Sequence, residues 1–198
     1  MENLAHRFLT EEEYLEYERK AETKSEYYRG ELFAMAGARA SHNIILSNLI
    51  RDLGNSLRKK PCTVFPSDMR VRVSSTGLYT YPDISIVCEK PIYLDSKEDT
   101  LLNPFVILEI LSDSTESYDR GAKFQMYRNI PELKEYVLVS TKYKKIESFV
   151  RSTDLWVLYE SIDSNPFLIQ SLGIEISLED MYEKVEIGNF FKIEREKN

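Results

Sequence analysis

Residues 105–112, FVILEILS, constrain the fold more than any other stretch of this sequence. Val106, Ile107 and Leu108 form an almost unbroken apolar run, which is typical of a central strand covered on both faces of its sheet. The run therefore predicts a layered α/β fold. Glu109 stands in the middle of the same strand, where a carboxylate is rarely buried without a partner. A salt bridge, an edge strand with one face exposed to solvent, or a functional site would each stabilise the charge of Glu109.

The rest of the chain alternates between helix and strand patterns. Helices are expected from capping residues and apolar spacing at about residues 11–21, 42–59 (capped by Ser41), 117–130 and within 176–185. Strands are expected from apolar runs at 64–73, 83–88, 105–111, 134–141, 145–150 and 155–161, after a short hairpin that turns at Arg29-Gly30. The first three of these strands can form a meander. The order predicts an αβββαβ core with a mixed central sheet flanked by helices, plus an N-terminal helix and hairpin and β-rich C-terminal additions.

Composition and charge narrow the class of protein. With 198 residues, the chain fits one domain over residues 1–198. No apolar run approaches the length of about 18 residues that a membrane span requires, and acids stand where a signal peptide would be apolar. Cys62 and Cys88 have no metal-binding spacing, so we expect reduced thiols in a cytoplasmic protein. The formal net charge of −7 argues against indiscriminate coating of nucleic acid, which depends on Lys and Arg.

A second acid, Asp83, opens the apolar strand YPDISIVC at residues 81–88. It stands 26 residues before Glu109 (109 − 83), so the two carboxylates meet only if their strands are neighbours. Neighbouring strands lie about 4.8 Å apart, which brings two carboxylates on one face within bridging distance of a metal ion. Mg²⁺ prefers oxygen ligands and removes the repulsion between the two acids. Taken alone, Pro82-Asp83 is better explained as a strand start whose acid accepts turn hydrogen bonds.

Four sequence blocks, taken in order, resemble a known family. They are YYRGELFAMAG with SHN, YPDISIVC, LEILSDST with YDRGAKFQMY, and EYVLV, and the likeness runs from about residue 9 to about residue 185. Pro82-Asp83 followed by Glu109 in the next strand resembles the PD-(D/E)XK nuclease superfamily. The blocks together are similar to the putative restriction endonuclease family of bacteria within it. The resemblance implies a restriction-endonuclease-like fold that hydrolyses DNA.

In that superfamily the Asp and the Glu bind Mg²⁺, and a lysine two residues after the Glu positions or activates the attacking water. This sequence has Leu111 at that place, which can do neither. The resemblance therefore implies a lysine moved to the following helix, and Lys123 is the candidate. Asp83, Glu109 and the backbone carbonyl of Ile110 would hold the Mg²⁺ or Mn²⁺ ion. Without the resemblance, Lys123 is explained as a solvated residue paired with an acid one helical turn earlier.

Three further residues are second-tier candidates. His42, at the start of the long helix, matches a histidine of the family pattern, although a histidine there more often caps a helix or hydrogen-bonds in the core. Glu31 is either an additional acid beside the metal or a surface residue of the hairpin. Asp68 precedes the strand with Arg70 and Arg72, and it either orients a neighbour or starts that strand.

We expect a Mg²⁺-dependent endonuclease with Asp83, Glu109 and Lys123 as catalytic residues and DNA as its substrate. One alternative is a nuclease-fold binding protein that has lost catalysis, which Leu111 and the acidic net charge both favour. Another is a hydrolase of a smaller phosphate ester with the same metal pair. Related nucleases act as dimers because a duplex has two strands to cut, so a homodimer is also open by analogy. No membrane partner is expected.

Overall fold

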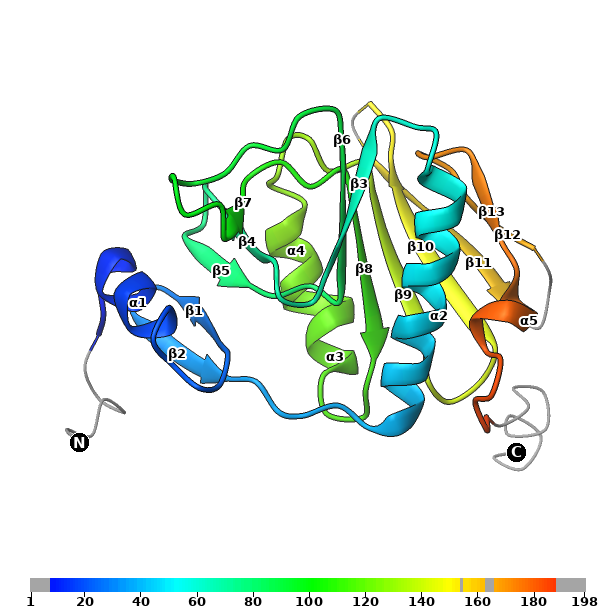
Figure 1. The fold of residues 1–198 in the computed structure, drawn as a ribbon, viewed down its shortest axis with the longest axis horizontal. Helices are drawn as coiled ribbons and strands as arrows, with labels where there is room; N and C mark the ends of the chain where they lie inside the picture. Colours follow the sequence, from blue (N-terminus) through cyan, green and yellow to red (C-terminus); the bar gives the residue numbers. More distant parts are fainter. Residues whose placement is uncertain (1–7, 154, 163–165, 188–198) are drawn as a thin grey trace.

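The computed structural model describes residues 8–153, 155–162 and 166–187. A six-stranded sheet carries helices on both faces, and a five-stranded sheet lies beside it (Figure 1). The helices are α1 (Glu11–Glu18), α2 (Ala40–Leu57), α3 (Glu116–Tyr118), α4 (Phe124–Tyr127) and α5 (Leu178–Met181), with a π-helical turn (Asp119–Lys123) joining α3 to α4. The strands are β1 (Ser25–Tyr28), β2 (Glu31–Ala34), β3 (Cys62–Pro66), β4 (Arg70–Val73), β5 (Leu78–Thr80), β6 (Ile84–Cys88), β7 (Thr100–Leu101), β8 (Val106–Leu111), β9 (Glu135–Ser140), β10 (Lys145–Arg151), β11 (Trp156–Ile162), β12 (Phe167–Ile169) and β13 (Ile174–Ile176).

The larger sheet is mixed and has the strand order β11-β10-β9-β8-β6-β3. Its β8 and β9 run parallel, and its other neighbours are antiparallel. The smaller sheet has the order β2-β1-β5-β4-β7, and β12 pairs with β13. The elements α2, β3, β6, β8, α3–α4 and β9 follow the predicted αβββαβ order, with β4, β5 and β7 inserted between its strands. The predicted fold class is confirmed.

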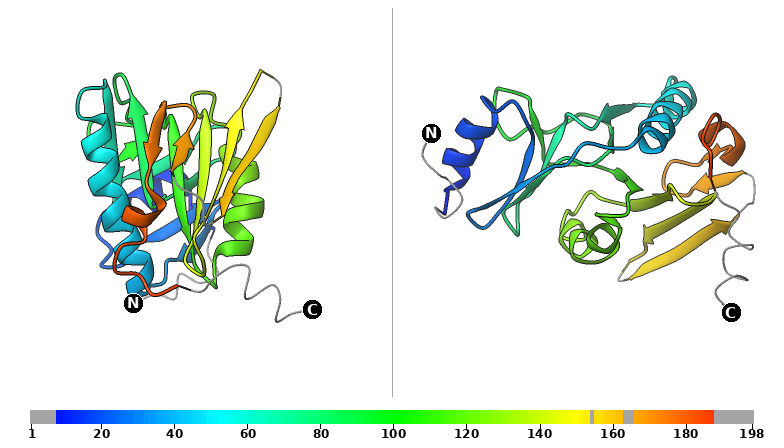
Figure 2. Two further views of the ribbon diagram at one scale, coloured as in Figure 1. Left: turned by 90° about the vertical axis from the view of Figure 1, so that its right-hand side faces the viewer. Right: turned by 90° about the horizontal axis from the view of Figure 1, so that it is seen from below.

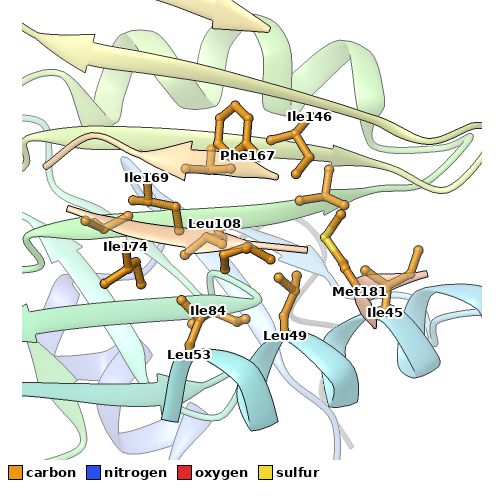
Figure 3. Close-up of a cluster of buried hydrophobic side chains, with 14 of the residues drawn as sticks. Ile45, Leu49, Leu53, Ile84, Leu108, Ile146, Phe167, Ile169, Ile174 and Met181 are labelled. Carbon is orange, nitrogen blue, oxygen red and sulfur yellow. The ribbon is translucent and has the colours of Figure 1, made fainter. Parts of the chain in front are cut away.

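Strand β8 lies at the centre of the larger sheet and is buried along its whole length, as predicted. Side chains on its two faces enter different apolar clusters. Val106, Leu108 and Ile110 pack with α2, β12, β13 and α5, whereas Ile107 and Leu111 pack with α3–α4. Figure 2 shows α2 and α3–α4 on opposite sides of the sheet, and Figure 3 shows the cluster on the α2 side. The helices therefore cover both faces of the central strand.

The single strand predicted over residues 64–73 is wrong. The chain turns after Pro66, whose carbonyl accepts from the amide of Met69 at 3.1 Å, and two strands in different sheets result. β3 pairs with β6 in the larger sheet, whereas β4 pairs with β5 and β7 in the smaller one. Proline lacks the N–H that a strand ladder needs, which explains why β3 ends there. The predicted meander consists of β3, β6 and β8.

Helices α1 and α2 differ in how they begin. α1 has the predicted capping box, in which the Thr10 side chain accepts from the amide of Glu13 and the Glu13 side chain accepts from the amide of Thr10. α2 begins at residue 40, and its N-cap, Arg39, makes no side-chain capping bond. Ser41 lies inside the first turn, so the predicted Ser41 cap is wrong. The apolar stripe predicted at every fourth position of α2 is buried and confirms its orientation.

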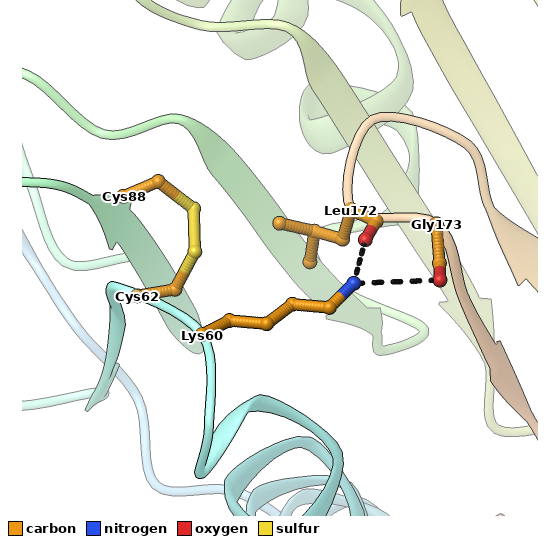
Figure 4. The surroundings of a disulfide bond; sticks show 5 residues. All are labelled: Lys60, Cys62, Cys88, Leu172 and Gly173. Carbon is orange, nitrogen blue, oxygen red and sulfur yellow. Dashed lines mark hydrogen bonds between the residues drawn. A yellow bond between two sulfur atoms is a disulfide. The ribbon is translucent and has the colours of Figure 1, made fainter.

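Cys62 and Cys88 form a disulfide, so the expectation of two reduced thiols is wrong (Figure 4). The antiparallel register of β3 and β6 sets the two residues directly opposite each other. Nearby, the ammonium of Lys60 donates to the carbonyls of Leu172 and Gly173, which joins the end of α2 to the turn between β12 and β13. The pairing of the cysteines follows from long-range register, which their sequence spacing does not reveal.

Ion pairs hold α1 against the smaller sheet. Arg19, directly after α1, donates to Asp99 through Nε at 2.7 Å and to Asp95 through Nη2 at 2.8 Å. The hydrogen bond from Arg19 lowers the pKa of Asp99 from its ordinary value to about 2. Asp99 also lies 3.2 Å from the buried guanidinium of Arg70 in β4. One carboxylate thus joins two arginines from different elements.

We expect Asp99→Asn to lower the free energy of unfolding by about 1–2 kcal/mol at pH 7, because Arg19 and the buried Arg70 lose an ionic partner. A carboxylate whose pKa is lower in the folded than in the unfolded state stabilises the fold above about pH 4, and this contribution disappears as the pH falls towards about 2. Urea denaturation should show the two proteins converging over that range. Glu16→Gln, an exposed change on α1, is the control. An unchanged gap at pH 2 would contradict the assignment.

Candidate active site

Strands β6 and β8 bring Asp83 and Glu109 together. In their antiparallel register Ile84 pairs with Leu108, so the next position sets Asp83 opposite Glu109. The amide of Asp83 donates to Oε2 of Glu109 at 3.3 Å, and the amide of Ile110 donates to Oδ2 of Asp83 at 2.8 Å. Each carboxylate is therefore bonded to the strand that carries the other.

Glu109 points towards α3–α4. Side chains alternate along a strand, so Glu109 shares a face with Ile107 and Leu111, and only 3% of its surface is exposed. Nζ of Lys123 lies 2.9 Å from its Oε1, and the hydroxyl of Tyr127 donates to the same oxygen at 3.1 Å. Two donors thus converge on Oε1, while Oε2 faces the neighbouring strand β6.

The helix presents Asp119, Lys123 and Tyr127, spaced four residues apart, towards this carboxylate. The turn that contains the first two is π-helical, a rare conformation that is frequent at functional sites. Nζ of Lys123 lies 3.5 Å from Oδ1 of Asp119, so the ion pair predicted between Lys123 and an acid one helical turn earlier does form. Lys123 is nevertheless only 5% exposed, which excludes the alternative of a solvated helix residue.

Three carboxylates surround the ammonium of Lys123, because Glu26 joins Glu109 and Asp119 at 3.2 Å. Burial alone would lower the pKa of Lys123, but the negative charges around it outweigh burial and raise that pKa well above its ordinary value. Burial also raises the pKa of Glu109, with the ammonium of Lys123 acting in the opposite direction. Lys123 is therefore a fixed positive charge inside the protein, and it favours the ionised form of Glu109.

Glu26 is the site residue that the sequence analysis missed. It lies in β1 of the smaller sheet, is buried, and accepts from the hydroxyls of Thr80 and Tyr118. Glu31 of the same hairpin, the acid predicted beside the metal, has an exposed side chain that makes no hydrogen bond or ion pair within the described ranges. An acid inside the aromatic strand SEYY is the same signal that singled out Glu109, and it could have identified Glu26.

Of the other two second-tier residues, His42 lies in the site and Asp68 lies outside it. Nε2 of His42, from the first turn of α2, lies 3.1 Å from Oδ2 of Asp83. Because a carboxylate only accepts, Nε2 carries the hydrogen and donates it. Asp68 lies outside the site, in the turn between β3 and β4, where its exposed carboxylate pairs with Lys24 at 2.7 Å. His42 therefore orients a site carboxylate, whereas Asp68 does not.

The donor set fits a hard divalent cation. Three carboxylates, those of Glu26, Glu109 and Asp119, lie around the single ammonium of Lys123, and Asp83 lies next to Glu109 on the neighbouring strand. This excess of negative charge favours a cation between Asp83 and Glu109. Over the residues that the structure describes, the hydrogen bonds of the Asp83 carboxylate use only Oδ2, and its side chain keeps 17% exposure. Among the described residues, no three His, Cys, Asp or Glu side chains are arranged to enclose a metal. Mg²⁺ suits such a set, since one or two carboxylates and several waters satisfy it.

A mixed sheet in which two acids meet across neighbouring strands is the arrangement of a restriction-endonuclease-like protein. Residues 11–182 match the Uma2 family, described as "putative restriction endonuclease", and the chain belongs to this family. The resemblance inferred from the sequence is thereby confirmed.

The chain is also similar to individual proteins. Two uncharacterised proteins of Synechocystis sp. are 36% and 32% identical, over 80% and 88% of this chain and 90% and 91% of their own lengths. A crystal structure described as a "putative nuclease belonging to DUF820" from Anabaena variabilis is similar, with a TM-score of 0.72 and 17% identity, over 90% of this chain and 99% of that one. This structural likeness supports the fold. In the part of the chain that the structure describes, no helix is both long and apolar enough to cross a bilayer.

We expect Lys123→Met to lower the free energy of unfolding by about 3–5 kcal/mol in the presence of EDTA, because it leaves buried carboxylates without their counter-ion. The loss should be smaller at pH 5 than at pH 8, because burial raises the pKa of Glu109 and of Asp119, and these two carboxylates take up protons as the pH falls. Urea denaturation at the two pH values measures both effects. Lys142→Met, at an exposed ion pair, is the control and should cost less than about 1 kcal/mol. A loss no larger than that of the control would contradict the buried ion pair.

Proposed function

We propose that this protein is a Mg²⁺-dependent endonuclease that hydrolyses the phosphodiester bonds of DNA. The observation that carries the proposal is that Asp83 and Glu109 meet across β6 and β8. Oε2 of Glu109 lies at the amide of Asp83, and its Oε1 lies at the buried ammonium of Lys123. Membership of the putative restriction endonuclease family supports DNA as the substrate, as does the description of the Anabaena protein as a putative nuclease.

Asp83, Glu109 and the backbone carbonyl of Ile110 would hold the ion, which is Mg²⁺ or Mn²⁺. When bound, the ion lowers the pKa of a water ligand and polarises the phosphoryl oxygen. The protein orients both carboxylates beforehand: the amide of Ile110 and Nε2 of His42 fix Oδ2 of Asp83, and Lys123 and Tyr127 fix Oε1 of Glu109. Such outer contacts orient metal ligands and tune their affinity.

Lys123 takes the part of the lysine that the superfamily carries two residues after the Glu, where this chain has Leu111. Its enclosure means that the ammonium acts through Glu109 rather than by direct contact with the substrate in this arrangement. It stabilises the ionised carboxylate and contributes positive charge near the phosphate, where negative charge develops during hydrolysis.

A nuclease-fold binding protein without catalysis is the second candidate. It is favoured by Leu111 at the usual lysine position and by the enclosure of Lys123. Cations on the surface near α3 are also paired with acids, such as Lys142 with Glu116 at 2.8 Å, so DNA would have to compete for them. The homodimer stays a prediction under either function.

We expect the purified protein to nick or linearise supercoiled plasmid DNA only with Mg²⁺ or Mn²⁺ present. Asp83→Asn and Glu109→Gln should each slow cleavage by about 100-fold or more, because each removes charge from the ligand set. Asp68→Asn, an exposed change outside the site, should cut like the parent. Cleavage that survives either site substitution would refute the assignment. Hydrolysis of nucleotides without cleavage of plasmid would instead indicate an esterase for smaller phosphate esters.

Calorimetric titration with Mn²⁺ in the absence of DNA distinguishes the enzyme from the binding protein. We expect the parent to bind Mn²⁺ and Asp83→Asn to lose that binding, because the Asp83 carboxylate is the more exposed of the two proposed ligand side chains. The binding-protein alternative predicts DNA binding by the parent with no heat of Mn²⁺ association.

A further inference from the structure

The ammonium of Lys123 is held by carboxylates from three separate elements. Glu109 comes from β8 at 2.9 Å, Glu26 from β1 at 3.2 Å, and Asp119 from the helix itself at 3.5 Å. An ammonium has three N–H donors, one for each of these acceptors. Only Glu26 among the three comes from the smaller sheet. The place of the ammonium therefore depends on how that sheet packs against the larger one.

The carboxylate of Glu26 is itself fixed on both oxygens. Its Oε1 accepts from the hydroxyl of Thr80 in β5 as well as from Lys123, and its Oε2 accepts from the hydroxyl of Tyr118 at 3.4 Å. The Thr80 hydroxyl also lies 3.3 Å from the hydroxyl of Tyr127, which donates to Glu109. A chain of hydroxyl contacts thus links Glu26 to Glu109 in parallel with the ammonium.

Glu26 differs from the two proposed metal ligands in what its carboxylate contacts. Oε2 of Glu109 accepts from the amide of Asp83, and Oδ2 of Asp83 accepts from the amide of Ile110, so these two carboxylates lie against each other's strands. The oxygens of Glu26 accept instead from Thr80, Tyr118 and Lys123, none of which lies in β6 or β8. These contacts direct Glu26 to the lysine rather than to an ion between Asp83 and Glu109.

We propose that Glu26 is a positioning residue that sets Lys123 against Oε1 of Glu109, so that Oε2 stays turned towards Asp83. The inference rests on the proposed function and assigns Glu26 no contact with the substrate. When the carboxylate of Glu26 is withdrawn, the ammonium follows its two remaining partners, Glu109 and Asp119. Glu109 then turns with it, and the pair of metal-binding acids loses its alignment.

Glu26→Asp tests this with the net charge unchanged. The shorter side chain withdraws the carboxylate by about 1.5 Å, the length of one C–C bond. We expect the single-turnover rate of plasmid cleavage at saturating Mg²⁺ to fall about 10- to 100-fold. The affinity for Mn²⁺ should fall much less than in Asp83→Asn, because both metal ligands are kept, and the affinity for DNA should match that of the parent. Glu31→Asp makes the same chemical change at an exposed position of the same hairpin, and it should cut like the parent.

A double-mutant cycle separates positioning from a general loss of structure. Lys123→Arg keeps the charge but changes the shape of the donor. If Glu26 acts through Lys123, the effects of Glu26→Asp and Lys123→Arg on the single-turnover rate do not multiply, and the combined variant is less impaired than their product. Effects that multiply would overturn the proposal.

The remaining outcomes are also decisive. Loss of Mn²⁺ binding in Glu26→Asp, to the extent expected for Asp83→Asn, would make Glu26 a metal ligand and overturn the proposal. An unchanged rate in Glu26→Asp, with a parent that cuts DNA, overturns the proposal and leaves the proposed function standing. A parent that cuts no DNA overturns both.

Thermal melts establish whether Glu26→Asp folds. If it does not, Tyr118→Phe replaces it, because this change removes only the hydroxyl that meets Oε2 of Glu26, at a side chain with 36% exposure. We expect a smaller fall in the same single-turnover rate, with Mn²⁺ binding retained. No fall in that rate would overturn the proposal.

Discussion

The pairing of β6 with β8 is the constraint on which the site depends. Side chains alternate along a strand, so a slip of one residue in this register would turn the side chain of Glu109 to the α2 face. Both faces of β8 are apolar at the other positions, with Val106 and Leu108 beneath α2 and Ile107 and Leu111 beneath α3–α4, so apolar burial alone does not fix this register. A slip is opposed because it would bury the Glu109 carboxylate among the apolar side chains beneath α2, away from Lys123. The charge of Glu109 therefore selects the register.

A carboxylate buried in that way needs a positive charge, and the helix over its face provides one. An enclosed ion pair is stable only when its geometry and its remaining hydrogen bonds are good, since both charges have lost their water. Lys123 meets this condition by donating to Glu109, Glu26 and Asp119, which come from both sheets and from the helix. The same charge that favours ionised Glu109 thereby connects the two sheets.

Local periodicity explains which parts of this arrangement could be predicted from the sequence. The apolar run of β8 and the four-residue spacing along α2 have the period of their own elements, so they are visible in the chain itself. Glu26 and Lys123 are 97 residues apart (123 − 26), and Cys62 meets Cys88 through strand register, which no local pattern reports. The division of residues 64–73 between two sheets likewise depends on distant partners. The family resemblance indicated Lys123 but gave no information on its enclosure.

The position of the lysine on a helix explains why the smaller sheet is part of the site. Position 111 shares a face with Glu109, so a lysine there would extend from the strand beside the carboxylate. Leu111 instead joins the apolar cluster beneath α3–α4, and Lys123 reaches Glu109 from the helix that covers this face. A lysine beneath a packed helix cannot use water to satisfy its N–H groups, so it requires protein acceptors. Glu109 supplies one acceptor from β8, and Asp119 supplies a second from the helix. The third is Glu26, which β1 of the smaller sheet brings from outside the αβββαβ core.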